Sequence, residues 1–306
     1  MISMSNARTF VWLFVYVQAA FIAVDLYEHW RLARKPGRHG VISANAAVIL
    51  AVGAACVGYS AIQLALASAL PSIDKLSDFA IRVTGSAAAA PGGPWTVPVF
   101  AIAFCIGTMF DYLVHRFLLH GPFWRLHENH HLPSVVSNVM PGIAARPFVI
   151  VPNFLINVGS CATIFLVVRL IGRPQLSATF LHLLPALLLT FTFVACASHS
   201  IFLRRFDWVE TSFRCLLLVG PREHLLHHAA KIKGNYGNFT MVWDRAFGTY
   251  VSPPRGETPL GLDYDQDFLG AITAGRFKLS PGFRSRYQIG QVCRLDKDGI
   301  NSLAAE

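Results

Sequence analysis

Long apolar runs, separated by short polar or basic stretches, make up the first two thirds of the chain. Most of them reach the roughly 18 residues that a helix needs to cross a lipid core of about 30 Å. Five runs indicate five membrane-spanning helices: Phe10–Val24, which continues in mixed form to Trp30, then Val41–Leu70, Val97–Val114, Phe148–Ile171 and Leu176–Ala197. We therefore predict an all-α protein, a multi-pass transmembrane bundle of about four to five helices.

The character of the chain changes after His199, where it becomes polar, basic and punctuated by glycine and proline. We expect three parts: N-terminal spans and a low-complexity loop in residues 1–94, a histidine-rich domain in residues 95–252, and a cytosolic tail in residues 253–306. The first apolar run has no clear cleavage site and little basic character ahead of it, so we expect a retained span rather than a removed signal peptide.

Composition agrees with a membrane protein. The chain is 54% hydrophobic and only 14% charged, whereas a soluble domain carries about 25% charged residues. The net charge of +9 does not indicate nucleic-acid binding, because no basic stripe with interleaved aromatic residues is present. The six cysteines are scattered without a C-x-x-C pair, so we expect them to be small apolar side chains rather than disulfides or metal ligands.

Basic residues predict the orientation in the membrane. The loop Arg31–Arg38 carries three arginines and a lysine, which favours the cytoplasmic side. Five spans then place residues 115–146 and everything after residue 199 on that same side. The same sidedness would result if residues 148–197 formed two helices that dip into one leaflet, and both arrangements stay open. We expect an integral protein of a bacterial inner membrane or of the endoplasmic reticulum.

Two histidine-rich stretches, at residues 115–131 and 224–228, are the candidate chemistry. In both, one histidine is followed three and four residues later by two more, and this spacing puts the three imidazoles on one helix face. Imidazole is the commonest metal ligand in proteins. The candidate metal ligands are His115, His120, His127, His130, His131, His224, His227 and His228, with His199 as a ninth.

The number of imidazoles exceeds what one ion uses, since zinc takes four ligands. We therefore expect two ions with four or five nitrogen ligands each. His115 and His120 are five residues apart, about 140° around an α-helix. Either the helix breaks near Gly121–Pro122, or the two histidines serve different metals. Three histidines without companions (His29, His39 and His182) are expected to be structural or interfacial, and a pH-sensing cluster is the alternative to a metal site.

Imidazole suits zinc, copper, iron and nickel alike, so the metal follows from the setting. A metal pair at the mouth of a lipid-embedded bundle has acyl chains or sterols as its natural substrates. Attack on an unactivated C–H bond requires a redox metal and dioxygen, whereas zinc has no redox chemistry. We therefore expect iron.

The ordered boxes H-x4-H, H-x2-H-H and H-x2-H-H resemble the fatty acid hydroxylase / sterol desaturase superfamily of membrane di-iron enzymes. HENHHLPSVVSNVMP is similar to its second box and following loop, and GNYGNFTMVWDRAFGTY to the segment after its last box. The resemblance covers roughly residues 100–250. It implies a helical membrane bundle whose cytosolic helical cap carries the boxes, and nine ligands that include His199. It also implies two irons (which zinc replaces in some purified preparations), O2, and electrons from a separate carrier such as a cytochrome b5-like protein or a ferredoxin.

Three acids stand near these histidines. Asp111 precedes His115 by four residues and could accept its free N–H; an ordinary helix-end acid is the alternative. Glu223 stands where some members of the superfamily have a histidine. It could be a ligand, an acceptor behind a ligand, or a solvated glutamate, which we expect. Asp244 orients a histidine of the last box or pairs with Arg245.

We predict an O2-dependent enzyme that hydroxylates or desaturates a lipid, an acyl chain or a sterol-like molecule. The alternative is a histidine-rich zinc or iron transporter, although transporters hold ions near the midplane of their spans. A zinc hydrolase is disfavoured because H-E-x-x-H is missing. The identity of the lipid, the position oxidised and the oligomeric state have no signal in the sequence.

Overall fold

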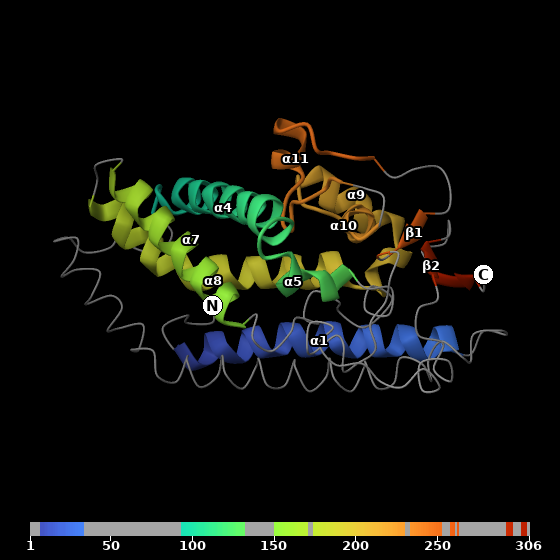
Figure 1. The fold of residues 1–306 in the computed structure, drawn as a ribbon. Helices are drawn as coiled ribbons and strands as arrows, with labels where there is room; N and C mark the ends of the chain where they lie inside the picture. The colour runs from blue at the N-terminus through green and yellow to red at the C-terminus, as the bar shows by residue number, and fades with distance from the viewer. Residues whose placement is uncertain are drawn as a thin grey trace.

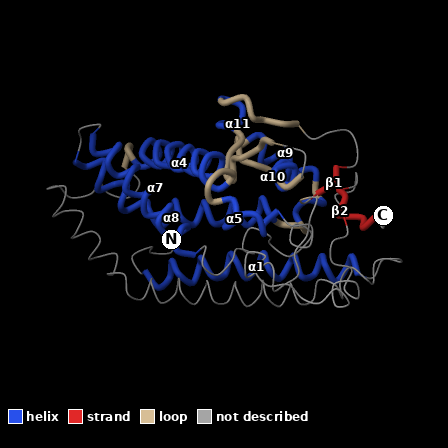
Figure 2. Tube along the Cα trace, viewed as in Figure 1, coloured by secondary structure: helices blue, strands red, loops and turns tan. Residues whose placement is uncertain are grey.

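The computed structural model describes part of the chain, and the protein is mostly helical there (Figures 1 and 2). The described residues are 7–33, 93–131, 150–170, 174–229, 233–252, 258–260, 262, 292–295 and 301–304. The predicted second span at Val41–Leu70 and the isolated His39 lie outside them, as do the side chains of His29 and His130.

Four long helices form the body of the protein: α1 (Ala7–Ala33), α4 (Thr96–Leu113), α7 (Ile150–Leu170) and α8 (Pro174–His199). Helix α8 is central, because it packs against α1, α4 and α7; Figure 1 shows it between α1 and α4. Each of these helices forms where an apolar run predicted one. Apolar side chains from α4, α7 and α8 make one core, which is composed of Val99, Ala103, Ile164, Val168, Leu176, Phe180 and Leu187.

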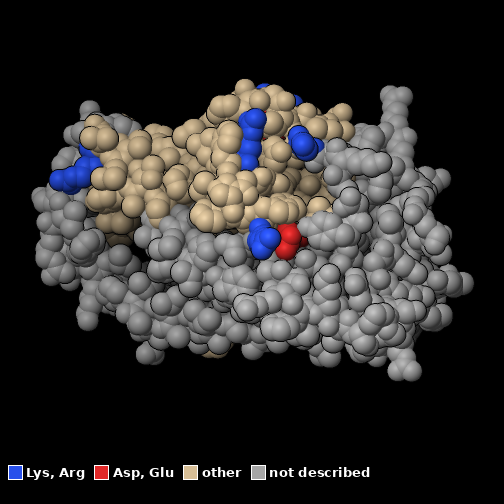
Figure 3. All heavy atoms as spheres, viewed as in Figure 1, with Lys and Arg blue, Asp and Glu red and all other residues tan. Residues whose placement is uncertain are grey.

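Two helical stretches of the described residues are long and apolar enough to cross a membrane, Thr96–Leu119 and Thr179–His199. They correspond to the predicted third and fifth spans. In α7 the described side chains give a shorter apolar helix, Gly159–Leu170. On the face shown in Figure 3, one basic patch lies at the left end of the described surface, the others lie over its middle and right, and the surface between them is uncharged. A membrane location is therefore supported, while the number of spans stays a prediction.

A cap of short helices covers one end of α4 and α8 (Figure 1). It contains α5 (Trp124–His127), a 3₁₀ turn (Glu128–His131), α9 (Asp207–Cys215), α10 (Pro221–His227) and α11 (Val242–Ala246). A second apolar core joins this cap to α1 and α8, and it consists of Phe21, Val194, Cys196, Ala197, Val209, Phe213, Val219 and Met241. Helix α10 begins with proline at its first position, where the missing N–H costs no hydrogen bond.

The tail departs from the all-helical prediction. Strands β1 (Thr258–Leu260), β2 (Val292–Leu295) and β3 (Asn301–Ala304) form a small antiparallel sheet in the order β1-β2-β3. Cys293 of β2 stands opposite Leu260 of β1 and Leu303 of β3. Each strand has only three or four residues, which is too short for an alternating pattern to distinguish a strand from a loop.

Candidate metal centre

The structure brings the two histidine-rich stretches together at the end of α4 and α8. Their imidazoles form two groups in which the possible ligand atoms all lie within 4.8 Å of one another. We call them the five-histidine group (His115, His120, His127, His131 and His227) and the three-histidine group (His199, His224 and His228). The groups adjoin, since the rings of His131 and His228 are 4.8 Å apart. The convergence predicted from the sequence is thus present in the fold, and His199 is part of it.

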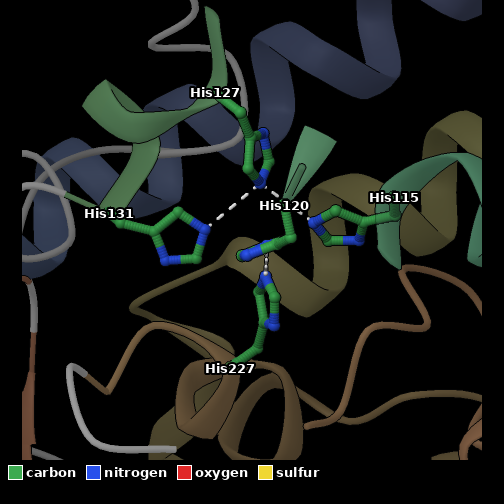
Figure 4. A group of neighbouring side chains, drawn as sticks. All are labelled: His115, His120, His127, His131 and His227. Carbon is green, nitrogen blue, oxygen red and sulfur yellow. Dashed lines mark hydrogen bonds between the residues drawn. The ribbon is translucent and has the colours of Figure 1, made fainter. Parts of the chain in front are cut away.

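The five-histidine group is assembled from four elements: the π-helix Val114–Leu119 with its C-cap, α5, the 3₁₀ turn and α10. Figure 4 shows the five rings directed toward a common centre, with His227 entering from α10 opposite His127. His127 and His131 belong to consecutive helical turns, and their rings are 4.9 Å apart. The spacing of four residues therefore puts the two imidazoles on one helix face, where they meet edge to face.

A π-helix at Val114–Leu119 explains the spacing of His115 and His120. The N–H of His120 bonds the carbonyl oxygen of His115 at 3.0 Å, so five residues complete one turn here. The two rings are 5.0 Å apart and belong to the same group. The helix ends at Leu119, and residues 120–123 form a turn, so it breaks at Gly121–Pro122 as the first alternative predicted. The second alternative, separate sites, is not supported, because the two histidines share a group. A Cβ at Gly121 would lie 2.3 Å from the Phe117 carbonyl oxygen, so the end of this turn requires glycine.

The contacts between imidazole nitrogens test whether the residues fit a metal. Four Nε2–Nε2 distances are short: 2.9 Å for His115–His127, 3.1 Å for His131–His127, 3.0 Å for His120–His227 and 2.8 Å for His224–His199. Two imidazole nitrogens bound at about 2.1 Å and at a right angle around one ion are about 3.0 Å apart. The distances therefore match neighbouring ligands of a common ion, in both groups.

Backbone carbonyls determine which nitrogen of three histidines faces the centre. The Nδ1 atom lies 2.6 Å from the Tyr236 oxygen in His115, 3.1 Å from the Gly234 oxygen in His227 and 2.7 Å from the Ala195 oxygen in His199. A carbonyl only accepts hydrogen bonds, so each Nδ1 donates and carries the proton. In the neutral imidazole Nε2 then presents its lone pair, which is the form that binds metal.

The imidazoles are shielded from water, and this shielding keeps His120 uncharged. His115, His224 and His228 are each 1% exposed. Desolvation lowers the pKa of His120 to about 4, because burial disfavours the charged imidazolium. His120 is therefore neutral at pH 7 and available as a ligand.

Asp244 supports the loop that supplies two of these carbonyls. Its carboxylate accepts the N–H of Tyr236 and of Gly237, each at 2.8 Å, and the hydroxyl of Thr249 at 2.7 Å. Burial raises the pKa of Asp244, and these hydrogen bonds oppose the effect. Asp244 therefore contacts no imidazole directly in these hydrogen bonds: it supports the loop whose carbonyls orient His115 and, in the last box, His227. Nor does it pair with Arg245, whose guanidinium lies over the Tyr250 ring at 4.4 Å.

Asp111 does not accept from His115. Its carboxylate accepts the side-chain N–H of Asn238 at 3.1 Å and the backbone N–H of the same residue at 3.4 Å, while the Tyr236 carbonyl takes the Nδ1 proton of His115. The fold places the 234–250 loop between this acid and the imidazole. Asp111 therefore steadies the 234–250 loop.

Glu223 is not the solvated glutamate that we expected. It is 1% exposed, and its Oε1 accepts from Arg214 Nε and from the Tyr250 hydroxyl, both at 2.9 Å. It belongs to neither histidine group. Glu223 stands at the third position of α10 and reaches back toward the Gly220 N–H at 3.5 Å, so it stabilises the start of the helix that carries His224. A glutamate three residues after a helix cap is a sequence signal for this role.

The remaining predicted positions fall outside the two groups. His182 is half-buried in α8 and is not part of either group, consistent with the structural role expected for it. Asn235 shapes a turn: it adopts a φ of 53°, and its side chain bonds the backbone of Val251, accepting from the N–H at 2.8 Å and donating to the carbonyl at 2.9 Å.

Residues 100–249 match a family model described as fatty acid hydroxylase. This range begins within α4 and ends just after α11, and it includes every histidine of both groups. No curated protein and no solved structure matches the chain.

Proposed function

Residues 100–249 belong to the fatty acid hydroxylase family, and from this premise we propose that the protein is a membrane-bound di-iron oxygenase that hydroxylates or desaturates a lipid. The family places the protein among oxygenases in general; two irons, O2 and the oxidation of an acyl chain or a sterol-like lipid are our proposal. It rests mainly on one observation, the two adjoining groups of imidazoles with Nε2 atoms about 3 Å apart.

The five-histidine group would hold one ion and the three-histidine group the other. His130 completes the proposed set of nine ligands as a sequence prediction. When bound, iron supplies the redox chemistry with O2 that attack on an unactivated C–H bond requires and that zinc lacks. Hydroxylation puts one oxygen atom into the lipid and releases the other as water, with two electrons and two protons supplied from outside. Desaturation would instead remove two hydrogen atoms from the lipid and, with the same two electrons and two protons, release both oxygen atoms as water.

The chain itself contributes ligand orientation and a dry environment. The carbonyls of Tyr236, Gly234 and Ala195 hold protons on the Nδ1 atoms and so direct lone pairs to the centre. Burial of His115 and His224 at 1% exposure excludes water from the imidazoles. The apolar stretches Thr96–Leu119 and Thr179–His199 both end at these groups, which favours a substrate delivered from the lipid phase.

The surroundings are part of the same proposal. We propose an integral protein with four to five spans, whose histidine groups face the cytoplasm of a bacterium or of a cell with an endoplasmic reticulum. We also propose a separate electron-transfer protein, a ferredoxin or a cytochrome b5-like carrier.

Two measurements on one pair of strains test this function. Metal content of the detergent-purified protein should approach two irons per chain. Lipid mass spectrometry of cells grown under ¹⁸O₂, with wild type or His227→Ala, should reveal a lipid that has gained one labelled oxygen or lost two hydrogens in the wild type alone. Purified protein without stoichiometric metal would refute the proposal. Metal uptake into vesicles without lipid oxidation would instead identify a transporter.

A further inference from the structure

Helix α1 carries two buried acids and lies outside the region that matches the family. Asp25 is 0% exposed and Glu28 is 1% exposed. A carboxylate is buried only where other groups compensate for its lost hydration. The partners of Asp25 directly follow His199 in the chain, which gives α1 a connection to the candidate metal centre.

Asp25 binds the chain directly after His199. Its Oδ1 accepts the Ser200 hydroxyl at 2.6 Å and the Phe202 N–H at 3.1 Å. The Ser200 hydroxyl oxygen in turn accepts the Leu203 N–H at 3.3 Å. One carboxylate therefore organises the turn that follows α8, whose last residue is His199.

Glu28 continues this connection one helical turn further along α1. It accepts from Arg205 at 2.9 Å and from Arg31 at 2.8 Å. Residues three apart share a helix face, so Asp25 and Glu28 follow the segment from Ser200 to Arg205 along one side of α1. The ring of Phe21 packs edge-on against Phe193 of α8, with ring centroids 5.7 Å apart. This contact joins α1 to α8 at a second place, four residues before Asp25 in α1.

His199 depends on this connection more than the other imidazoles do. It comes from neither histidine-rich stretch, and as the last residue of its helix it lies where helices fray. Its Nδ1 bonds the Ala195 carbonyl within α8, and its Nε2 meets His224 at 2.8 Å. His224 is held from the opposite side by α10. The distance between the two imidazoles is thus set by how the end of α8 is anchored, and Asp25 provides that anchor.

We propose that Asp25 is a positioning residue for the three-histidine group. By holding the turn at Ser200 and Phe202, it fixes His199 against His224. Helix α1 thereby anchors a site whose histidines all come from residues 100–249. This inference rests on the proposed function. The simpler role for Asp25, a contact that only holds two helices together, makes a different prediction for the two ions.

The experiment compares Asp25→Ala with Asp25→Asn in the full-length protein. Asn keeps an oxygen that accepts from both Ser200 and Phe202, whereas Ala removes it. We expect Asp25→Ala to weaken binding of one ion by about 10- to 100-fold, as is typical when support behind a ligand is lost. Bound iron should fall from two toward one per chain, and Asp25→Asn should restore it. Tyr16→Ala is the matched control, since Tyr16 lies on the same helix and is 63% exposed.

Each outcome decides between the proposals. If the wild type binds no iron, the proposed function fails. If the wild type binds two irons and Asp25→Ala also binds two with unchanged affinity, only the positioning role is overturned. Loss of both ions together in Asp25→Ala would likewise overturn it, because Asp25 would then support the whole fold. Should Asp25→Ala not fold, Ser200→Ala decides: selective weakening of one ion supports the inference, and wild-type affinity for both refutes it.

Discussion

Replacing Asp244 with asparagine tests whether the 234–250 loop positions the five-histidine group. Both backbone N–H donors of Tyr236 and Gly237 point at this carboxylate at 2.8 Å. In Asp244→Asn one of the two oxygens becomes an NH2 group, which faces a backbone N–H and cannot accept from it. The side chain is 0% exposed, so water cannot replace the lost acceptor.

The size of the effect follows from these contacts. A hydrogen bond to a charged group contributes about 1.5–3 kcal/mol, and a buried N–H left without an acceptor costs about 1–3 kcal/mol. We therefore expect a loss of about 3–5 kcal/mol of unfolding free energy, a large part of the 5–15 kcal/mol typical of folded proteins. The loop also provides the carbonyls that orient His115 and His227, so one ion should bind about 10- to 100-fold more weakly.

Thermal unfolding in detergent and metal titration measure these two effects. Asp207→Asn is the matched control, because it makes the same replacement at a side chain that is 86% exposed. Substitutions at such positions usually change the unfolding free energy by no more than about 0.5 kcal/mol. The ion that remains in Asp244→Asn should be the one held by the three-histidine group. If Asp244→Asn unfolds at the wild-type temperature and binds both ions with wild-type affinity, the loop does not position the imidazoles.

Other substitutions separate the two groups and test the loop and the cap. His227→Ala and His224→Ala should each lose mainly one ion and all lipid oxidation, as judged by metal analysis and lipid mass spectrometry; loss of the same ion in both would contradict two separate groups. Gly237→Ala places a Cβ 2.2 Å from a backbone carbonyl oxygen, so it should unfold at a lower temperature and bind less metal. Gly159→Ala, where the nearest atom is 3.7 Å away, should not. Arg214→Met removes the cation that pairs with the Glu223 carboxylate, which is 1% exposed. The substitution should lower the unfolding free energy by about 1–3 kcal/mol; an unchanged urea-unfolding curve would contradict this.

Patterns with a fixed period along the chain predicted the fold and site best. Apolar runs give the helices α1, α4, α7 and α8, and the spacing of four residues brings the imidazoles of His127 and His131 together on one face. Such patterns are local, so the sequence shows them directly. The convergence of the two histidine-rich stretches was consistent with the number of predicted spans, because five spans place both stretches on the same side of the membrane.

The contacts behind the imidazoles could not be predicted, because they depend on which distant segment comes to lie beside them. The acceptor of His115 is a main-chain oxygen at Tyr236, and a carbonyl has no sequence signature. Asp111 was assigned by helix spacing to the imidazole next to it, whereas a loop from residues 234–250 occupies that place. Two acids in the first apolar run, Asp25 and Glu28, were visible but had no predicted partner until α8 was placed against α1.

The π-helix at Val114–Leu119 restricts how the length of this segment can vary. In an ordinary α-helix, histidines four residues apart would stack, so the step of five works only while the wide turn persists. Adding one residue between His115 and His120 would rotate one imidazole away from its neighbours, whereas removing one would keep the two on one face only if the wide turn became an ordinary α-helical turn. Transplanting this centre into a designed helical bundle therefore requires copying the backbone of that turn along with the histidines.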